Sequence, residues 1–260
     1  MISKVDAPVR IRVGKLPIDV VDFAGALDMI DRLVRGGEGG TVYTPNVDHI
    51  VMAERNERFQ KAYGAASLSL VDGTPVLWAS RLLRTPLPMK VSGSDLVVPL
   101  MERAAERGYR VYFLGGAPGV ADLARQKLEA ALPGIQIVGI DDSRIDVSGE
   151  LLDTDEIVER IQNAGPDLVL VALGAPKQEI WSQARRALLK PAVLIGVGAS
   201  LDFVAGIQKR APRWMSKVGV EWVYRLAQEP RRLAGRYLLR DPEFCWILLR
   251  QLLTSQGPVS

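Results

Sequence analysis

Between residues 40 and 200 the chain alternates short β-rich runs with longer helical patterns, and this alternation constrains the fold more than any other feature. Runs such as Leu168–Leu173 are apolar throughout, which is typical of strands covered on both faces. The pattern predicts βα units around a mostly parallel sheet. The predicted strands are Thr41–Thr44, Ser67–Val71, Arg110–Leu114, Ile135–Ile140, Leu168–Leu173 and Val193–Val197. The predicted helices are Leu96–Arg107, Val120–Ala131, Glu156–Ala164 and Lys177–Leu188.

The two ends of the chain differ from this central pattern. The first forty residues indicate a small β-α unit whose helix begins near Asp22 or Gly25. Residues 213–253 contain eight Arg or Lys against four acidic residues, and prolines divide this part into short helical pieces at Pro212, Pro230 and Pro242. We therefore predict an α/β core over residues 1–205, with a Rossmann-like sheet flanked by helices, and a basic amphipathic helical appendage over residues 206–260.

Composition restricts the classes of protein and site. A chain of 260 residues with 48% hydrophobic and 24% charged residues is expected to be globular. The single cysteine, Cys245, excludes an intramolecular disulfide framework, and the single histidine, His49, excludes the usual His/Cys metal cages. Because we find neither a secretory signal pattern nor an apolar run of ~18–20 residues, we expect a cytoplasmic protein that does not cross the membrane.

Ligands of open α/β sheets bind outside the carboxyl ends of the strands, so the residues that follow each predicted strand are informative. Five strand ends carry glycines or hydrogen-bonding side chains: Thr44–Asn46, Asp72–Thr74, Gly115–Gly119, Gly174–Glu179 and Gly196–Ser200. Two of these turns lead into helices, where exposed N–H groups favour a phosphate. The set predicts a diphosphate-bearing ligand. Each glycine turn alone is more often only a tight turn, and neither of these two turns matches GxGxxG or Walker A.

The side chains at these strand ends differ in how well a structural role alone explains them. Asp72 precedes a Gly-Thr-Pro string, so it is either a cap of the next helix or a general base in a cleft. The Gln178 amide both donates and accepts, which suits recognition of a base or a sugar hydroxyl. Glu179 is explained by its place in the first turn of a helix, and we expect His49 to be structural.

The appendage interleaves aromatic residues with arginines, as at Trp222, Tyr224, Tyr237, Phe244 and Trp246. A solvated helical face explains scattered charges. Aromatic residues beside Arg on an amphipathic helix also suit a membrane interface with anionic lipid heads or single-stranded nucleic acid. Charge alone does not separate these possibilities.

Several strings run in the same order as those of one known family, from about residue 10 to 240. They are Thr44-Pro-Asn46, Val71-Asp-Gly73, Val91-Ser-Gly-Ser-Asp95, Leu173-Gly-Ala-Pro-Lys-Gln-Glu179, Gly196-Val-Gly198 through Asp202-Phe203, Gly206, Arg210-Ala-Pro212 and Glu221-Trp-Val-Tyr-Arg225. With these strings the chain resembles the WecG/TagA/CpsF glycosyltransferases of bacterial surface-polymer synthesis. The Pro-Lys-Gln-Glu and Arg-Ala-Pro strings are the most specific of them.

The resemblance implies an inverting transferase that needs neither a metal nor a cofactor. It would move N-acetylmannosamine, its uronic acid or a hexose from a UDP-sugar onto a polyprenyl-diphosphate-linked glycan. Asp72 would be the base, with Thr44 and Asn46 in the same pocket. The residues predicted to bind the donor are Lys90, Gly115, Gly116, Gly174, Lys177, Gln178, Glu179 and Gly198. Lys90 stands where the family usually has Arg, so the charge is kept but not the two-pronged contact with phosphate.

The resemblance also implies an appendage that docks on the inner face of the cell membrane and supplies arginines to the site, for which Arg225, Arg232 and Arg236 are the candidates. It permits a homodimer, and we predict no nucleic-acid partner. Two alternatives remain at this point. One is a nucleotide-dependent oxidoreductase, which lacks the dinucleotide pattern, and the other is a non-enzymatic binder of nucleic acid or lipid heads.

Overall fold

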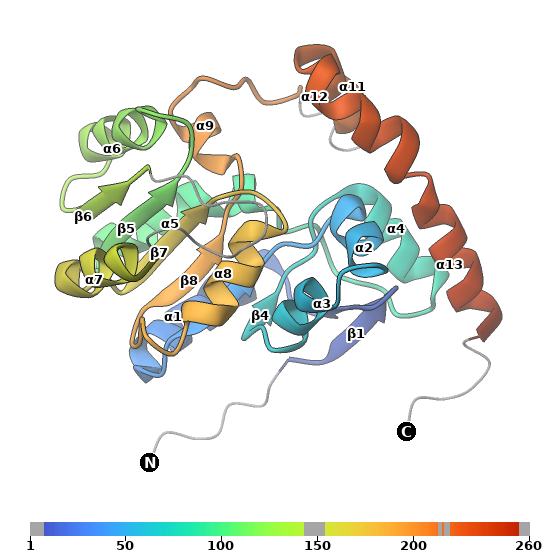
Figure 1. Cartoon of the computed structure of the whole chain (residues 1–260), viewed down its shortest axis with the longest axis horizontal. Helices are drawn as coiled ribbons and strands as arrows, with labels where there is room; N and C mark the ends of the chain where they lie inside the picture. The colour runs from blue at the N-terminus through green and yellow to red at the C-terminus, as the bar shows by residue number, and fades with distance from the viewer. Residues whose placement is uncertain (1–7, 143–153, 213–214, 216–218, 255–260) are drawn as a thin grey trace.

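A six-stranded, all-parallel sheet forms the centre of the molecule (Figure 1). The computed structural model describes residues 8–142, 154–212, 215 and 219–254, without the side chains of residues 154, 232 and 239. In the order β4-β3-β8-β7-β5-β6, the strands are Leu68–Ser69, Gly40–Tyr43, Val193–Gly196, Leu168–Ala172, Arg110–Gly115 and Gln136–Asp141. All six predicted strands are confirmed to within two residues. The clearest is β7, whose five residues are apolar and buried, as expected for a strand covered on both faces.

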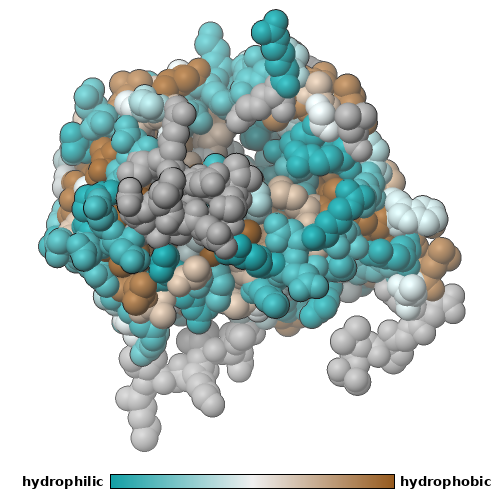
Figure 2. Space-filling model, viewed as in Figure 1, coloured by the Kyte–Doolittle hydropathy of each residue, from teal (hydrophilic) through white to brown (hydrophobic). Residues whose placement is uncertain are grey.

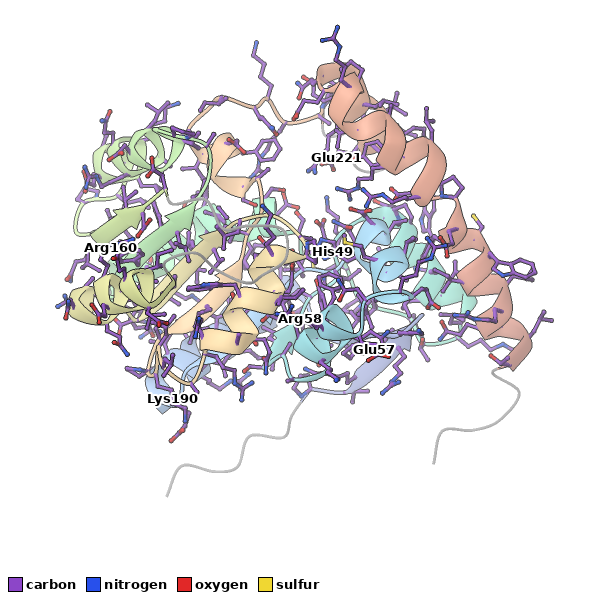
Figure 3. The ribbon with its side chains drawn as sticks, viewed as in Figure 1. His49, Glu57, Arg58, Arg160, Lys190 and Glu221 are labelled. Carbon is purple, nitrogen blue, oxygen red and sulfur yellow. The ribbon has the colours of Figure 1, made fainter. Side chains whose placement is uncertain are left out.

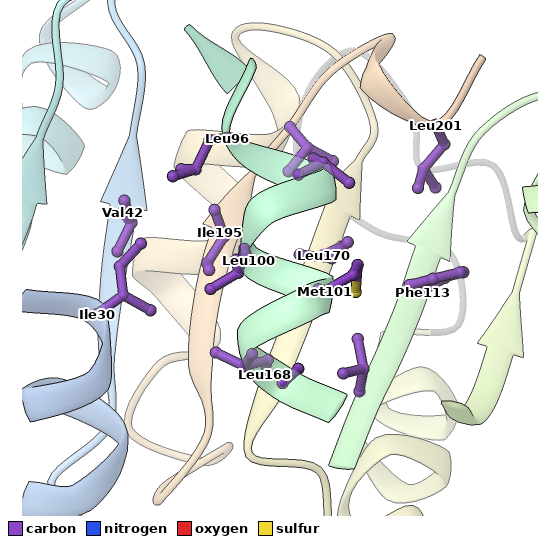
Figure 4. Close-up of a cluster of buried hydrophobic side chains, with 14 of the residues drawn as sticks. Ile30, Val42, Leu96, Leu100, Met101, Phe113, Leu168, Leu170, Ile195 and Leu201 are labelled. Atoms are coloured by element: carbon purple, nitrogen blue, oxygen red, sulfur yellow. The ribbon is translucent and has the colours of Figure 1, made fainter. Parts of the chain in front are cut away.

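Helices cover both faces of this sheet. One face carries α1 (Phe23–Gly36), α5 (Gly93–Arg107), α6 (Val120–Ala131) and α9 (Ser200–Val204), and the other carries α7 (Thr154–Ala164) and α8 (Lys177–Arg185). Figure 4 shows Leu100 and Met101 of α5 close to Leu170 of β7, all three fully buried. Burying each such side chain contributes about 1.5–3 kcal/mol. The four predicted helices are confirmed, with α8 ending three residues early.

A second hydrophobic cluster lies beside the sheet, beyond β4. An antiparallel hairpin of β1 (Arg10–Val13) and β2 (Leu16–Asp19) packs there with α2 (Val47–Ala53), α3 (Glu57–Gly64) and α4 (Thr74–Leu82). The predicted N-terminal β-α unit is thus a hairpin followed by α1, and Asp22 caps that helix by accepting a hydrogen bond from Gly25 N–H at 2.8 Å. Of the three short helices between β3 and α5, α2 and α3 were not predicted, whereas α4 is the helix expected to follow Asp72 and Gly73.

The C-terminal arm, residues Glu221–Thr254, runs from the top of the molecule down its right-hand side in Figure 1. It consists of α11 (Glu221–Gln228), α12 (Pro230–Ala234), the π-helix η1 (Gly235–Arg240) and α13 (Glu243–Thr254), so Pro230 and Pro242 mark boundaries as predicted. Phe244 and Ile247 of α13 are buried in the second cluster. Among the described helices, none is both long and apolar enough to span a bilayer.

Candidate active site

The carboxyl ends of four parallel strands, β3, β4, β7 and β8, meet below the C-terminal arm and bound a cavity of about 370 Å³. Its volume lies within the range of small-molecule sites, roughly 300–1,000 Å³. We call it the strand-end cavity, and Figure 2 shows a hollow between the arm and the sheet. The strand ends contribute Thr44, Asn46, Asp72, Gly174, Gln178 and Gly198, and the arm contributes Arg225, Arg236, Tyr237 and Arg240.

A second cavity of about 470 Å³ adjoins the first, and we call it the arm cavity. Its lining is mainly apolar and includes Val47, Pro75, Trp222, Pro242 and Phe244. The two cavities share part of their walls: Asn46, Asp72, Arg225, Arg236 and Tyr237. A polar chamber and an apolar chamber therefore meet at the Asp72 carboxylate.

Asp72 is partly buried and follows β4. The N-cap of α4 is Gly73, which has a positive φ of 99° and receives no side-chain capping bond, so the capping interpretation of Asp72 is not supported. Among the described residues none forms a hydrogen bond or close ion pair with its carboxylate. Burial raises the pKa of Asp72, against the opposing charges of Arg225 and Lys90. An unpartnered carboxylate with a raised pKa suits proton abstraction in a cleft.

Thr44 and Asn46 extend the same wall from the end of β3. Asn46 is the N-cap of α2, and its Oδ1 accepts hydrogen bonds from His49 N–H and from Arg236 Nη2, each at 3.2 Å. The backbone of Asp72 is tied to this loop through Pro45 O at 2.9 Å. Because the Asn46 oxygen is engaged, its amide nitrogen is the group left to donate to a ligand.

Gln178 lines the strand-end cavity, whereas Glu179 is fully buried behind it. The side-chain oxygen of Gln178 accepts a hydrogen bond from Gly198 N–H at 3.0 Å, and its nitrogen donates to Glu179 Oε1 at 2.8 Å. His49 also reaches the cavity wall. Burial, and then the charge of Arg236, lower the pKa of His49 to about 3, so this ring is neutral as expected for a structural histidine.

Two cations near Asp72 are held by a carboxylate of the arm. Glu221 binds Arg225 Nη2 through Oε1 at 2.8 Å and Lys90 Nζ through Oε2 at 3.5 Å. Lys90 also lies 3.5 Å from Asp95 Oδ2. Glu221 on α11 lies across the site from His49 on α2 (Figure 3). The arm thereby keeps positive charge next to Asp72 without neutralising it directly.

Two further arginines of the arm meet one buried acid of the core. Asp48 on α2 pairs with Arg236 Nε at 3.3 Å and with Arg240 Nη2 at 3.4 Å. The Asp48 side chain is 8% exposed, whereas Arg240 is 51% exposed. The arm is therefore attached to the strand-end wall through groups that also line the cavity.

Comparison with known proteins agrees with this geometry. The profile described as "Glycosyl transferase WecG/TagA/CpsF family" matches residues 11–258. The chain belongs to this family. The N-acetylglucosaminyldiphosphoundecaprenol N-acetyl-beta-D-mannosaminyltransferase of Bacillus spizizenii is 33% identical over 221 residues, which is 85% of this chain and 83% of the relative. The protein of the same name from Bacillus subtilis is 30% identical over 213 residues, 82% of this chain and 80% of the relative. The protein is thus a glycosyltransferase, and the oxidoreductase and non-enzymatic alternatives lose their support.

The residues predicted to bind the donor of this glycosyltransferase divide into two groups. Those that line a cavity are Gly174, Gln178 and Gly198, with Lys90 in the arm cavity. Those that line neither cavity are Gly115, Gly116, Lys177 and Glu179. Gly115 ends β5, which lies beyond β7 in the sheet, so its turn is one strand further from the site. Of the predicted arginines, Arg225 and Arg236 line both cavities, and the Arg232 side chain is outside the described part.

Several residues that line the strand-end cavity were not among the predicted site residues: Asp48, Gly93, Ser94, Phe203, Tyr237 and Arg240. The Val91–Asp95 string already pointed to Gly93 and Ser94, which form the first turn of α5 at the cavity. Nothing in the local sequence singled out Asp48, because a helix-start acid is usually explained by the helix dipole. Within the described ranges, His, Cys, Asp and Glu side chains form no group able to hold a metal ion.

Proposed function

We propose that the protein transfers a sugar of the N-acetylmannosamine type from UDP to a polyprenyl-diphosphate-linked glycan, with inversion and without a metal ion, in bacterial surface polysaccharide synthesis. The activity for which two relatives are named supports the sugar and the acceptor, and both relatives align with more than four-fifths of this chain. The family profile matches the chain from residue 11 to residue 258, which runs from the first strand into the C-terminal segment. A uronic acid or a hexose remains the second candidate for the sugar.

The position of Asp72 at the junction of two cavities is the observation that carries the mechanism. The sugar nucleotide would occupy the polar strand-end cavity, and the acceptor would enter from the apolar arm cavity. The Asp72 carboxylate takes the proton of the acceptor hydroxyl while that oxygen bonds to the anomeric carbon. The bond from this carbon to the diphosphate breaks on the opposite face, and UDP leaves with the electron pair.

The departing diphosphate gains negative charge, which must be stabilised for the bond to break. Arg225 and Arg236 of the arm supply guanidinium groups that bind phosphate through two donors at once. The first turn of α5, at Gly93 and Ser94, adds backbone N–H groups and the positive end of a helix dipole. We propose metal independence because these groups can carry the charge that a divalent ion carries in other transferases.

The outer face of the arm supports a location at the membrane. Leu238, Trp246, Leu249 and Leu253 are exposed, at 58%, 65%, 45% and 71%, along the outer side of η1 and α13. Figure 2 shows hydrophobic atoms at the right-hand edge, where α13 lies. Arg240 and Arg250 belong to the same two helices and are each 51% exposed while pairing with Asp48 and Glu54 of the core. Arginines and exposed apolar side chains on one helical segment suit an anionic lipid surface. This apolar stripe would hold the arm cavity next to the lipid-linked acceptor on the cytoplasmic face of the membrane. The competing outcome is a homodimer that forms through the same stripe.

Calorimetric titration with UDP, UDP-N-acetylmannosamine, UDP-glucose, GDP-mannose and NAD in EDTA tests the proposal. We expect the uridine compounds to bind without metal, UDP-N-acetylmannosamine most tightly, and its sugar to appear on a polyprenyl-diphosphate-linked N-acetylglucosamine acceptor. Absence of uridine nucleotide binding, even with anionic vesicles present, would overturn the donor assignment. Preferential use of UDP-glucose would instead favour a hexosyltransferase.

A further inference from the structure

Glu179 is a fully buried acid that the mechanism above does not use. Its neighbours come from three other elements: Tyr43 of β3 donates its hydroxyl to the Glu179 backbone carbonyl, and His49 of α2 and Tyr63 of α3 lie beside the carboxyl group. His49 Nδ1 is 2.7 Å from the Tyr63 hydroxyl and 3.9 Å from Glu179 Oε1. Among the described residues, Gln178 is the only side chain that donates to the Glu179 carboxyl group, and Oε2 has no partner.

The two contacts of the Gln178 amide leave one orientation open to it. A backbone N–H can only donate, so the Gly198 N–H must face the Gln178 oxygen. The Gln178 nitrogen then faces Glu179 Oε1, which accepts. Turning the amide over would set its NH2 group against the Gly198 N–H, donor against donor. Atom placement in amides is often ambiguous, but here the chemistry of the partners decides it.

One N–H of the Gln178 nitrogen remains without an acceptor in the described part of the chain. The side chain lines the strand-end cavity and is only 4% exposed. The backbone of Gly196 packs closely against this amide, since a Cβ atom added at Gly196 would lie 3.0 Å from the Gln178 nitrogen. The amide therefore has no room to swing away and offers its remaining donor where a ligand would lie.

We propose that Glu179 is a positioning residue: with the Gly198 N–H it locks the Gln178 amide so that an N–H donor serves an acceptor oxygen of the sugar nucleotide. This inference rests on the proposed function for the identity of the ligand. It assigns to the Glu of the Pro-Lys-Gln-Glu string a role without ligand contact. The oxygen recognised belongs either to the sugar or to the uridine diphosphate.

The chemistry required of Glu179 is an accepting oxygen, not a charge. Its neighbours Tyr43, Tyr63 and His49 are uncharged, and no cation among the described residues forms an ion pair with it. Burial raises the pKa of Glu179 to about 7, so the acid is neutral below that pH, and its carbonyl oxygen accepts from Gln178 in either protonation state. A glutamine at this position would keep the shape and the accepting oxygen, whereas a leucine would keep the volume alone.

The test compares Glu179→Gln with Glu179→Leu, using the full chain with UDP-N-acetylmannosamine and the lipid-linked acceptor. We expect Glu179→Gln to stay within about threefold of the wild-type kcat/KM, because its carbonyl still accepts from Gln178. Glu179→Leu should lose about tenfold or more in kcat/KM while its circular dichroism remains native. Glu179→Leu should add little to the loss of Gln178→Ala in a double-mutant cycle, since both act through one amide.

Wild-type kcat/KM in Glu179→Leu, or losses that simply add in the cycle, would overturn the positioning role. If Glu179→Leu does not fold, Glu179→Asp takes its place in the cycle. Aspartate keeps the acid, but its side chain is one methylene shorter, so its oxygen lies farther from the Gln178 nitrogen. Titration of Glu179→Leu with UDP and with the UDP-sugar identifies the part of the ligand that accepts from Gln178. Weaker binding of both ligands places the accepting oxygen on UDP. Weaker binding of the UDP-sugar alone places it on the sugar. Wild-type binding itself tests the proposed function separately.

Discussion

The two halves of the active site are held in different ways. On the strand-end side, Asn46 and Gln178 are fixed by hydrogen bonds to backbone groups at 3.2 and 3.0 Å in a largely buried wall. On the arm side, Arg225 and Arg236 are held by the carboxylates of Glu221 and Asp48. Backbone bonds at strand ends cannot be exchanged without disturbing the sheet, whereas a diphosphate can replace a carboxylate partner of an arginine. One half is preorganised, and the other is adjustable.

This difference has an electrostatic consequence. Side chains of the arm pairs are partly exposed, 24% for Arg236 and 36% for Arg225, so solvent and salt weaken these pairs. Weak ion pairs suit this role. The carboxylates keep the arginines near the cavity, and little free energy is lost when a phosphate replaces the carboxylate as the partner of an arginine. We therefore expect changes on the strand-end side to affect chemistry most, and changes on the arm to affect substrate binding and location.

The largest effect is expected from Asp72→Asn. Removing the base should lower kcat by roughly 10²–10⁴-fold, the usual contribution of general base catalysis. Binding of UDP-N-acetylmannosamine, measured by calorimetry, should change by only a few fold. Asp142→Asn, at an exposed acid outside both cavities, is the control. A normal kcat in Asp72→Asn would remove the base from the mechanism.

Arg236→Ala tests the arm side of the active site. It removes contacts to Asn46 and Asp48 together with a phosphate-binding group, so we expect kcat/KM to fall by about 10²-fold. Arg231→Ala is the matched control, since Arg231 is exposed on the neighbouring α12 and lines neither cavity. Equal losses in the two variants would mean that the arm acts only through its net charge.

Leu249→Glu tests the membrane stripe. It places a charge within the exposed apolar face of α13, and losing the insertion of one leucine should weaken binding to anionic vesicles by about tenfold. Leu188→Glu alters an equally exposed leucine, 49% against 45%, in the segment after α8 and should leave sedimentation with vesicles unchanged. Unchanged vesicle binding with a shift from dimer to monomer would instead assign the stripe to a second copy of the chain.

The prediction with the smallest expected effect on activity concerns stability and pH. Because the pKa of Glu179 is raised from 4.5 to about 7 in the folded protein, the unfolded chain releases this proton first as pH rises. The Glu179 contribution to stability should therefore decline between pH 4.5 and 7 by at most on the order of 3 kcal/mol and then level off. The buried His49 has the opposite trend below pH 6.5, so the comparison with Glu179→Gln is what isolates the Glu179 contribution. Glu179→Gln should lack this decline, so its Tm advantage grows with pH, and parallel Tm curves for the two proteins would contradict the assignment.

Local patterns were enough to determine much of the molecule. Apolar runs and three-to-four periodicity identified the six strands and four of the helices, because both signals are repeated over adjacent residues. The same analysis brought Thr44, Asn46, Asp72 and Gln178 into one pocket, since the carboxyl ends of parallel strands meet at one edge. The family strings added the base and the class of reaction.

Contacts between distant segments were decided only by the tertiary structure. The helices α2, α3 and α4 have seven to nine residues, too few for a clear periodicity, and are stabilised by the second cluster. The turn at Gly115 is kept from the cavity by the order of strands, which no local pattern records. Asp48 meets Arg236 only because α13 packs on the hairpin and carries the arm across the site. Sequence therefore determined which groups perform the chemistry, and packing over long chain separations determined which of them meet.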